Sequence, residues 1–146
     1  MVNLEPIFSA KYRVYWSETD AAIMMHFSNF FRVCERAEED FFASLNISQR
    51  GEVGKRLLMP RVHAECDYKN SLRPGDLYSV NIVEIVLGKS SIRYTYEIYN
   101  ETSKQISAIC KIVAVVYDEI NNKAMEIPNE IRKKLIEIGA VEQKNA

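Results

Sequence analysis

The spacing of apolar positions predicts a long helix in the first third of the chain. Between Ser28 and Leu45 the apolar side chains recur every three or four residues, while the charged residues lie away from that stripe. Ser28 is a residue type that favours the N-cap position. We therefore predict a helix over residues 28–45. Its apolar stripe comprises Phe30, Val33, Cys34, Ala37, Phe41 and Leu45.

Alternating apolar and polar positions predict strands on both sides of this helix. Residues 8–16 form a first strand, and residues 57–117 indicate four antiparallel strands in hairpin succession. Turn chemistry separates these strands at Arg73–Asp76, which contains Pro and Gly, and at residues 88–90. A short final helix opens at Pro128. Its inward positions are Ile131, Leu135 and Ile138. In residues 61–68, the apolar positions are Val62, Ala64, Cys66 and Tyr68.

This order of elements predicts an α+β fold. The long helix must bury a broad apolar stripe, and the sheet is the only surface large enough to cover it. We expect a single domain over residues 1–146. In that domain a curved antiparallel sheet of about five strands wraps around the long helix, and a short C-terminal helix follows.

Composition excludes several classes of partner. The formal net charge of −1 gives no basic field for a nucleic acid. No apolar run approaches the roughly 18–20 residues that a membrane span needs. The start of the sequence lacks the positive and apolar regions of a signal peptide. We therefore expect a cytoplasmic protein that binds neither nucleic acid nor membrane.

Several chemically interesting residues have simpler structural interpretations. Cys34, Cys66 and Cys110 form no Cys-x-x-Cys motif and occupy apolar positions, so we expect buried free thiols. The acidic run Glu38–Asp40 occupies consecutive helix positions and is expected to be surface charge. His63 alternates with apolar positions and is expected on a solvated face. The histidines and carboxylates show no metal-ligand spacing, so no metal is expected.

The segment between the first strand and the long helix carries the strongest candidate chemistry. Asp20 lies just after the strand and a few residues before the helix start. Unpaired N–H groups at a helix start can stabilise a developing oxyanion, so a carboxylate facing them suits hydrolysis of an acyl group. His26 and Asn29 are candidates to orient water or the substrate carbonyl. The alternatives are that Asp20 caps a turn, His26 is packed and hydrogen-bonded, and Asn29 stabilises the helix start.

Three segments, spread over residues 12–117, together resemble the hotdog-fold acyl-CoA thioesterases of the 4-hydroxybenzoyl-CoA thioesterase-like family. They are Glu18–Asp20 with His26, Ser28–Phe30 and Glu35–Ala37; Asp67–Lys69 with Leu72–Asp76; and Gly88–Ser91. The loop between Asp20 and the helix departs from the family pattern. Residues 21–25 contain no glycine, and Phe27 stands where the family has the second histidine of a pair.

The resemblance implies hydrolysis of an acyl-CoA thioester to free acid and CoA, with no cofactor because CoA is part of the substrate. Asp20 is then the nucleophile or general base, and the first N–H groups of the long helix form the oxyanion hole. Lys89 and Ser90 are expected to contact the CoA phosphates. The resemblance further implies a homodimer or homotetramer with the active site between subunits. The alternatives are a non-catalytic acyl-CoA or acyl-carrier binding protein and a hotdog enoyl-CoA hydratase or dehydratase.

Overall fold

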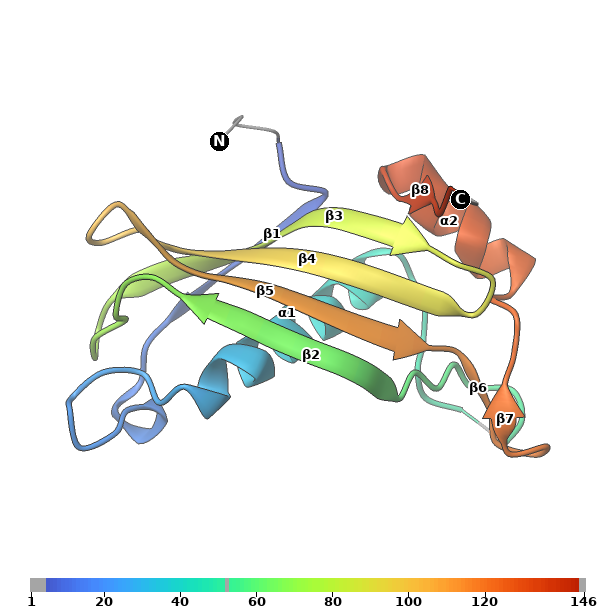
Figure 1. The fold of residues 1–146 in the computed structure, drawn as a ribbon, viewed down its shortest axis with the longest axis horizontal. Helices are drawn as coiled ribbons and strands as arrows, with labels where there is room; N and C mark the ends of the chain where they lie inside the picture. Colours follow the sequence, from blue (N-terminus) through green and yellow to red (C-terminus); the bar gives the residue numbers. More distant parts are fainter. Residues whose placement is uncertain (1–4, 52, 145–146) are drawn as a thin grey trace.

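An antiparallel sheet curves around one long helix (Figure 1). The structure is a computed structural model and describes residues 5–51 and 53–144. Its elements in chain order are β1 (Phe8–Arg13), η1 (Trp16–Glu18), α1 (Ser28–Ser44), β2 (Arg61–Tyr68), β3 (Leu77–Leu87), β4 (Ser91–Asn100), β5 (Gln105–Val115), β6 (Tyr117–Asp118), β7 (Lys123–Ala124), α2 (Asn129–Ile138) and β8 (Val141–Glu142).

The sheet has the strand order β1-β3-β4-β5-β2, and all of these neighbours are antiparallel. This arrangement confirms the predicted fold class of a curved antiparallel sheet with a long helix and a short C-terminal helix. The order places β1 and β2 at the two edges of the sheet, on either side of the β3–β4–β5 meander. The predicted hairpin succession is therefore correct for β3, β4 and β5 but wrong for β2, which pairs with β5 and not with β3. The short strand β8 was not predicted and pairs in parallel with β3.

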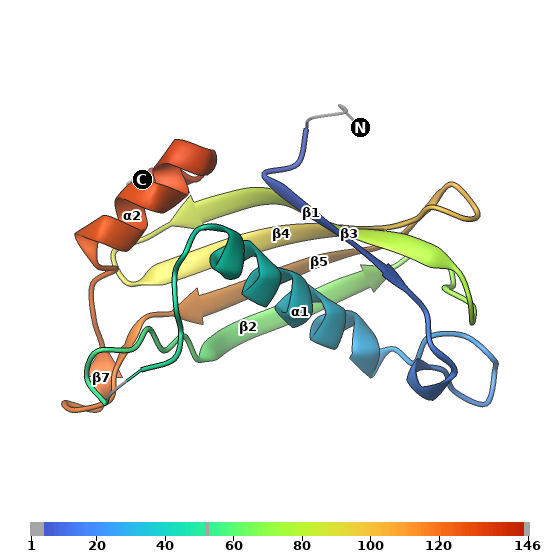
Figure 2. The same ribbon diagram turned by 180° about the vertical axis from the view of Figure 1, so that it is seen from behind.

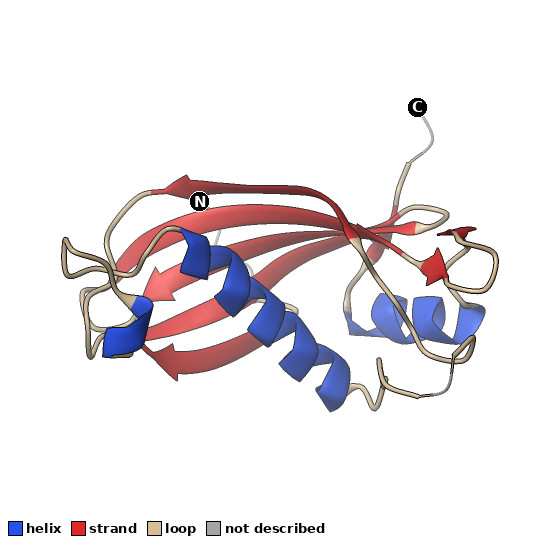
Figure 3. Cartoon of the chain, turned by 90° about the horizontal axis from the view of Figure 1, so that it is seen from below, coloured by secondary structure: helices blue, strands red, loops and turns tan. Residues whose placement is uncertain are grey.

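Helix α1 crosses one face of the sheet and encloses the core against it (Figures 2 and 3). The predicted stripe is buried from Phe30 to Phe41, and the helix ends one residue before the predicted Leu45. Facing it, β4 contributes Tyr94 and Tyr96, each at most 1% exposed. Phe27 rather than Ser28 occupies the N-cap position, and Ser28 is the first helical residue.

Two of the three cysteines are joined, so the expectation of free thiols is wrong for that pair. Cys66 of β2 and Cys110 of β5 stand directly opposite each other in the antiparallel register and form a disulfide. Cys34 of α1 is the buried free thiol. The partners are 44 residues apart in sequence. Only the non-local pairing of β2 with β5 brings them together, so their spacing gives no sign of the bond.

Glu38 is buried between α1 and the sheet, which contradicts its expected surface position. It is 2% exposed, whereas Glu39 and Asp40 are exposed as expected. Position 38 lies four residues after Cys34 and therefore falls within the stripe that faces the sheet. The charge is compensated by Arg61 of β2, whose two terminal nitrogens both donate to the carboxylate.

The final helix α2 forms where Pro128 predicts it, but it does not bury every expected position. Leu135 is fully buried and Ile131 is partly buried, whereas Ile138 is 41% exposed. The helix ends at Ile138, and Gly139, with a φ of 123°, turns the chain into β8. Among the described residues, neither helix has the length and hydrophobicity that a membrane span requires.

Candidate active site

A pocket of about 450 Å³ lies between the loop that precedes α1, the start of α1 and the end of β2. Most of its lining is apolar, and among the described residues that line it only Asp20 carries a carboxylate. The lining residues are Asp20, Met24, Met25, Phe27, Phe30, Tyr68, Lys69, Asn70 and Ser71. Asp20, the predicted catalytic residue, therefore lines an apolar pocket beside a helix start.

Asp20 begins a tight turn that fixes its carboxylate. The backbone N–H of Asp20 donates to the carbonyl of Met24 (2.9 Å), and the N–H of Ile23 donates to the carbonyl of Asp20 (2.9 Å). The N–H of Ala22 donates to Asp20 Oδ1 (2.8 Å). The second oxygen, Oδ2, has no hydrogen-bonding partner among the described residues. Asp20 thus caps a turn with one carboxylate oxygen, as in the structural alternative, and the other oxygen is unpaired among the described residues. A catalytic role for it stays a prediction.

The turn is closed without glycine by an isoleucine in a left-handed conformation. Ile23 has a φ of 56°, which is rare for a β-branched residue. The left-handed region is less favourable by about 1–2 kcal/mol for a residue with a Cβ. The Ile23 carbonyl also accepts a hydrogen bond from Arg73 Nη1 (3.3 Å). Residues 21–25 therefore keep a turn that would ordinarily use glycine.

The first amides of α1 already have acceptors. The Ser28 N–H donates to His26 Nδ1 (3.2 Å), the Asn29 N–H to the His26 carbonyl (2.9 Å), and the Phe30 N–H to the Phe27 carbonyl (3.3 Å). The N–H of Phe27 has no acceptor among the described residues. The amide without an acceptor therefore belongs to Phe27, a residue that lines the same pocket as Asp20. An oxyanion site at the helix start stays a prediction.

His26 and Asn29 hold this loop together and are not among the residues that line the pocket. The backbone N–H of His26 and the side-chain Nδ2 of Asn29 both donate to the carbonyl of Glu18, at 2.9 and 2.8 Å. The His26 ring hydrogen-bonds the Ser28 hydroxyl (2.8 Å) and stacks on the Phe27 ring. These contacts match the structural alternatives for both residues. Their contact with water or substrate stays a prediction.

Lys89 and Ser90 belong to the turn between β3 and β4, and that turn lies at the opposite end of the sheet from the loop between η1 and α1, to which Asp20 belongs (Figure 1). Lys89 is highly exposed and pairs with Glu126 at 3.5 Å. Arg132 of α2 supports the turn by donating to the carbonyls of Gly88 (2.7 Å) and Lys89 (3.2 Å). Within one chain the structure does not bring this turn to Asp20, so its contact with CoA stays a prediction.

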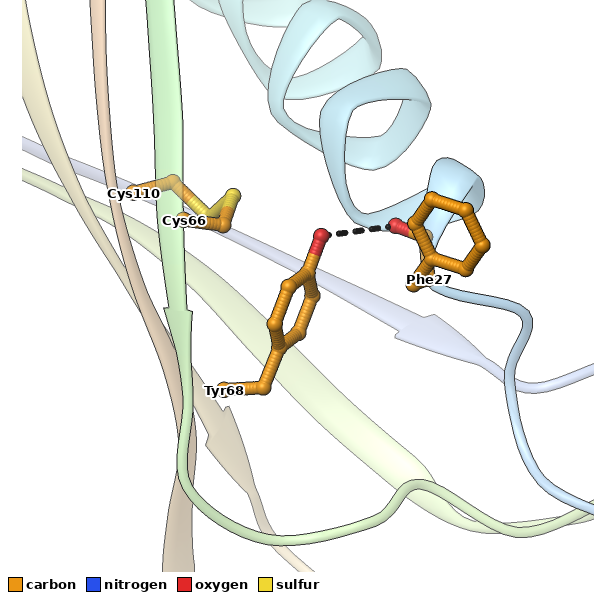
Figure 4. Close-up of a disulfide and its surroundings, with 4 residues drawn as sticks. All are labelled: Phe27, Cys66, Tyr68 and Cys110. Carbon is orange, nitrogen blue, oxygen red and sulfur yellow. Dashed lines mark hydrogen bonds between the residues drawn. A yellow bond between two sulfur atoms is a disulfide. The ribbon is translucent and has the colours of Figure 1, made fainter.

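Tyr68 lines the pocket and received no catalytic or binding role in the sequence analysis, although it belongs to one of the three segments that carry the family resemblance. Its hydroxyl donates to the carbonyl of Phe27 at 3.1 Å (Figure 4). Its ring meets the Phe30 ring edge to face, with 5.0 Å between centroids. Partial burial, with a smaller contribution from Cys34, raises the pKa of Tyr68. Alternation placed Tyr68 on the apolar side of its strand, but its partners lie some 40 residues earlier, beyond the reach of local patterns.

Known thioesterases are similar to this chain in sequence. Residues 14–135 match the family model described as the thioesterase-like superfamily. A 1,4-dihydroxy-2-naphthoyl-CoA hydrolase from Thermosynechococcus vestitus is 30% identical over 107 residues, which cover 73% of this chain and 73% of that protein. The match to the family model therefore extends over most of the chain, including the candidate site.

Solved structures show the same fold. A 1,4-dihydroxy-2-naphthoyl-CoA thioesterase from Synechocystis superposes with a TM-score of 0.81 at 26% identity, covering 88% of this chain and 95% of that one. A DHNA-CoA thioesterase from Staphylococcus aureus superposes with a TM-score of 0.78 at 16% identity, covering 90% and 89%, and supports the fold alone. The expected resemblance to hotdog-fold thioesterases is confirmed, and this chain belongs to the thioesterase-like superfamily.

Proposed function

We propose that this protein hydrolyses an acyl-CoA thioester to a free acid and CoA, with Asp20 as nucleophile or general base and the Phe27 amide as oxyanion donor. One observation carries the proposal. Asp20 Oδ2 and the Phe27 N–H both lack a partner among the described residues, and both residues line one pocket. One group can attack or activate water, and the other can donate to the carbonyl oxygen.

The chemistry takes one of two courses at Asp20. The carboxylate attacks the thioester carbonyl, expels CoA as a thiolate and leaves a mixed anhydride that water opens. Alternatively, the carboxylate removes a proton from water while that water attacks the carbonyl. In both courses the carbonyl oxygen gains negative charge, and loss of one donor to such an oxygen typically lowers kcat about 10²–10³-fold. The proton ends on the departing thiolate or in solvent.

The pocket walls favour an apolar acyl group. Met24, Met25, Phe27 and Phe30 line the same pocket as Asp20 and provide flexible and aromatic surface. The similar proteins from Thermosynechococcus and Synechocystis are named for a naphthoyl-CoA substrate. We therefore place aromatic acyl-CoAs first among the substrates to test, with aliphatic ones beside them.

The open edge of β2 supports a dimer with the site between subunits. No strand within the described part of the chain pairs with its outer side, and Val62 and Tyr68 are 61% and 48% exposed. Such an edge presents unpaired N–H and C=O groups to another chain. Arg61 and the β3–β4 turn lie at the same end of the sheet, because Arg61 pairs with Ala114 and Ser91 with Val115. Antiparallel pairing of two β2 strands therefore brings the second copy's Lys89–Ser90 turn toward this pocket, where CoA phosphates can reach it.

A panel of aromatic, aliphatic and enoyl-CoAs tests the proposed activity. The expected result is catalytic release of free CoA thiol from at least one saturated or aromatic acyl-CoA. Tight binding of acyl-CoA without turnover contradicts hydrolysis and favours a non-catalytic binding protein. Loss of the enoyl double bond without thiol release contradicts it in favour of a hydratase. Measuring thiol release and enoyl absorbance on the same samples separates the three functions.

A further inference from the structure

The hydroxyl of Tyr68 connects the end of β2 to the residue that starts α1 (Figure 4). It donates to the carbonyl of Phe27 at 3.1 Å, and the Phe30 N–H donates to that carbonyl at 3.3 Å. The edge-to-face contact between Tyr68 and Phe30 fixes the ring beside these hydrogen bonds. Two donors on one carbonyl restrict the backbone of Phe27, whose own N–H is the proposed oxyanion donor.

The position of Tyr68 depends on the outer edge of the sheet. It is the last residue of β2, and its register partner is Ala108 of β5. Within one chain, the only strand among the described residues that pairs with β2 is β5, so the position of Tyr68 depends on how firmly β2 is joined to β5. Two residues before Tyr68, on the same side of β2, the Cys66–Cys110 disulfide joins this strand covalently to the internal strand β5 (Figure 4).

We propose that Tyr68 is a positioning residue of the thioesterase site and that the Cys66–Cys110 disulfide holds it in place, so that reduction of the disulfide loosens the site. This inference rests on the proposed function, because the group that Tyr68 positions is the Phe27 amide. Tyr68 acts through the Phe27 backbone and takes no part in bond making. Its raised pKa keeps the phenol protonated, and therefore able to donate, over the neutral pH range.

The redox step needs a dithiol as the reductant. Thiolate attack on one sulfur of the disulfide breaks the Sγ–Sγ bond; the dithiol supplies two electrons and two protons and itself becomes a disulfide. Cys66 is half-buried on the edge strand and Cys110 is fully buried, so attack occurs at Cys66. Burial, reinforced by Glu38, raises the pKa of the Cys34 thiol, which keeps that thiol protonated and out of the exchange.

Tyr68→Phe tests the positioning role, because it removes the hydroxyl and keeps the ring. We expect kcat to fall about 3- to 10-fold with KM nearly unchanged, as for the loss of one hydrogen bond. We also expect faster amide hydrogen exchange in peptides covering residues 24–31. The matched control is Tyr117→Phe, which removes a hydroxyl from β6 at the far end of the sheet and should match the wild type (Figure 1).

Wild-type kcat and exchange in Tyr68→Phe overturn the positioning role. The two readouts separate this inference from the proposed function. If the wild type hydrolyses no acyl-CoA, the proposed function fails, and exchange over residues 24–31 still decides whether Tyr68 holds the helix start. Unchanged KM with a lower kcat distinguishes positioning from a loss of substrate binding.

The disulfide is tested by comparing oxidised protein with protein reduced by dithiothreitol. Hydrolysis is followed by loss of thioester absorbance, and the thiol count is checked by alkylation and mass. Reduction of the wild type should reproduce the lower kcat and faster exchange of Tyr68→Phe. Reduction of the Tyr68→Phe protein should lower kcat little further, because reduction and the substitution both act through the contact between Tyr68 and Phe27. An unchanged reduced wild type, or an equally large effect of reduction in Tyr68→Phe, overturns the role of the disulfide.

Discussion

Residue 23 holds a β-branched side chain in the left-handed region, in the turn that fixes the candidate catalytic carboxylate. Its side chain is 54% exposed, so little buried contact compensates for this conformation. The turn is instead maintained by the hydrogen bonds around Asp20 and by Arg73. A site residue is thus positioned by a local conformation that the isoleucine itself disfavours.

Replacing Ile23 with glycine and with alanine separates this backbone effect from side-chain packing. Glycine adopts the left-handed conformation freely, whereas alanine keeps the Cβ that disfavours it. We expect the free energy of unfolding of Ile23→Gly to exceed that of Ile23→Ala by about 1 kcal/mol, after allowing for the greater freedom of glycine in the unfolded chain. Chemical denaturation of both variants measures the difference. Equal or greater stability of Ile23→Ala contradicts the interpretation.

For single residues, the sequence pattern predicted that Asp20 is the candidate carboxylate, but it did not predict which groups lie around Asp20. Asp20 was identified because a strand end and a helix start bracket it, and both are local patterns. The free amide belongs to Phe27 because the His26 ring occupies the Ser28 N–H, which depends on side-chain geometry. Tyr68 reaches Phe27 only through tertiary contact. Local spacing carries no information on either arrangement.

Strand β2 was predicted correctly as a strand, but its environment in the sheet was not predicted. Alternation gave residues 61–68 an apolar side, and the structure forms a strand there. That side is nevertheless 48% exposed at Tyr68, and an irregularity in the pairing between Arg61 and His63 interrupts the alternation at Val62, which is 61% exposed. Alternation predicts that one side of the strand is buried, but it does not predict what buries it. We propose that a second copy of the chain does so.

The variant Val62→Lys tests whether a second copy of the chain pairs with β2. A lysine on an edge strand opposes pairing with another strand, and a two-fold interface would receive it twice. We expect the wild type to sediment as a dimer or tetramer and Val62→Lys to sediment as a folded monomer, with lower kcat/KM. Leu77→Lys is the control, because Leu77 is similarly exposed at 55% but lies at the start of β3. A monomeric wild type, or an oligomeric Val62→Lys, contradicts the interface.

For the molecule as a whole, the order of elements determined the fold. A helix with one apolar stripe and several long strands allow few arrangements, and the predicted curved sheet around α1 is confirmed. The pairing of β2 with β5 rather than with β3 was not predicted. Long-range features escaped prediction. The disulfide and the Glu38–Arg61 pair each join residues that only the assembled sheet and helix bring together. The separation between Asp20 and the turn that contains Lys89 also depends on the assembled sheet, so the sequence pattern did not predict it.

The central claim is that Asp20 performs the chemistry of an acyl-CoA thioesterase. The most direct test compares kcat of the wild type, Asp20→Asn and Asp67→Asn on the best acyl-CoA substrate. Asparagine keeps an oxygen for the Ala22 N–H and removes the charge, and Asp67 is an exposed carboxylate on β2 that does not line the pocket. We expect Asp20→Asn to lower kcat about 10²–10⁴-fold with unchanged thermal stability, and Asp67→Asn to match the wild type. Wild-type kcat in Asp20→Asn would contradict the account.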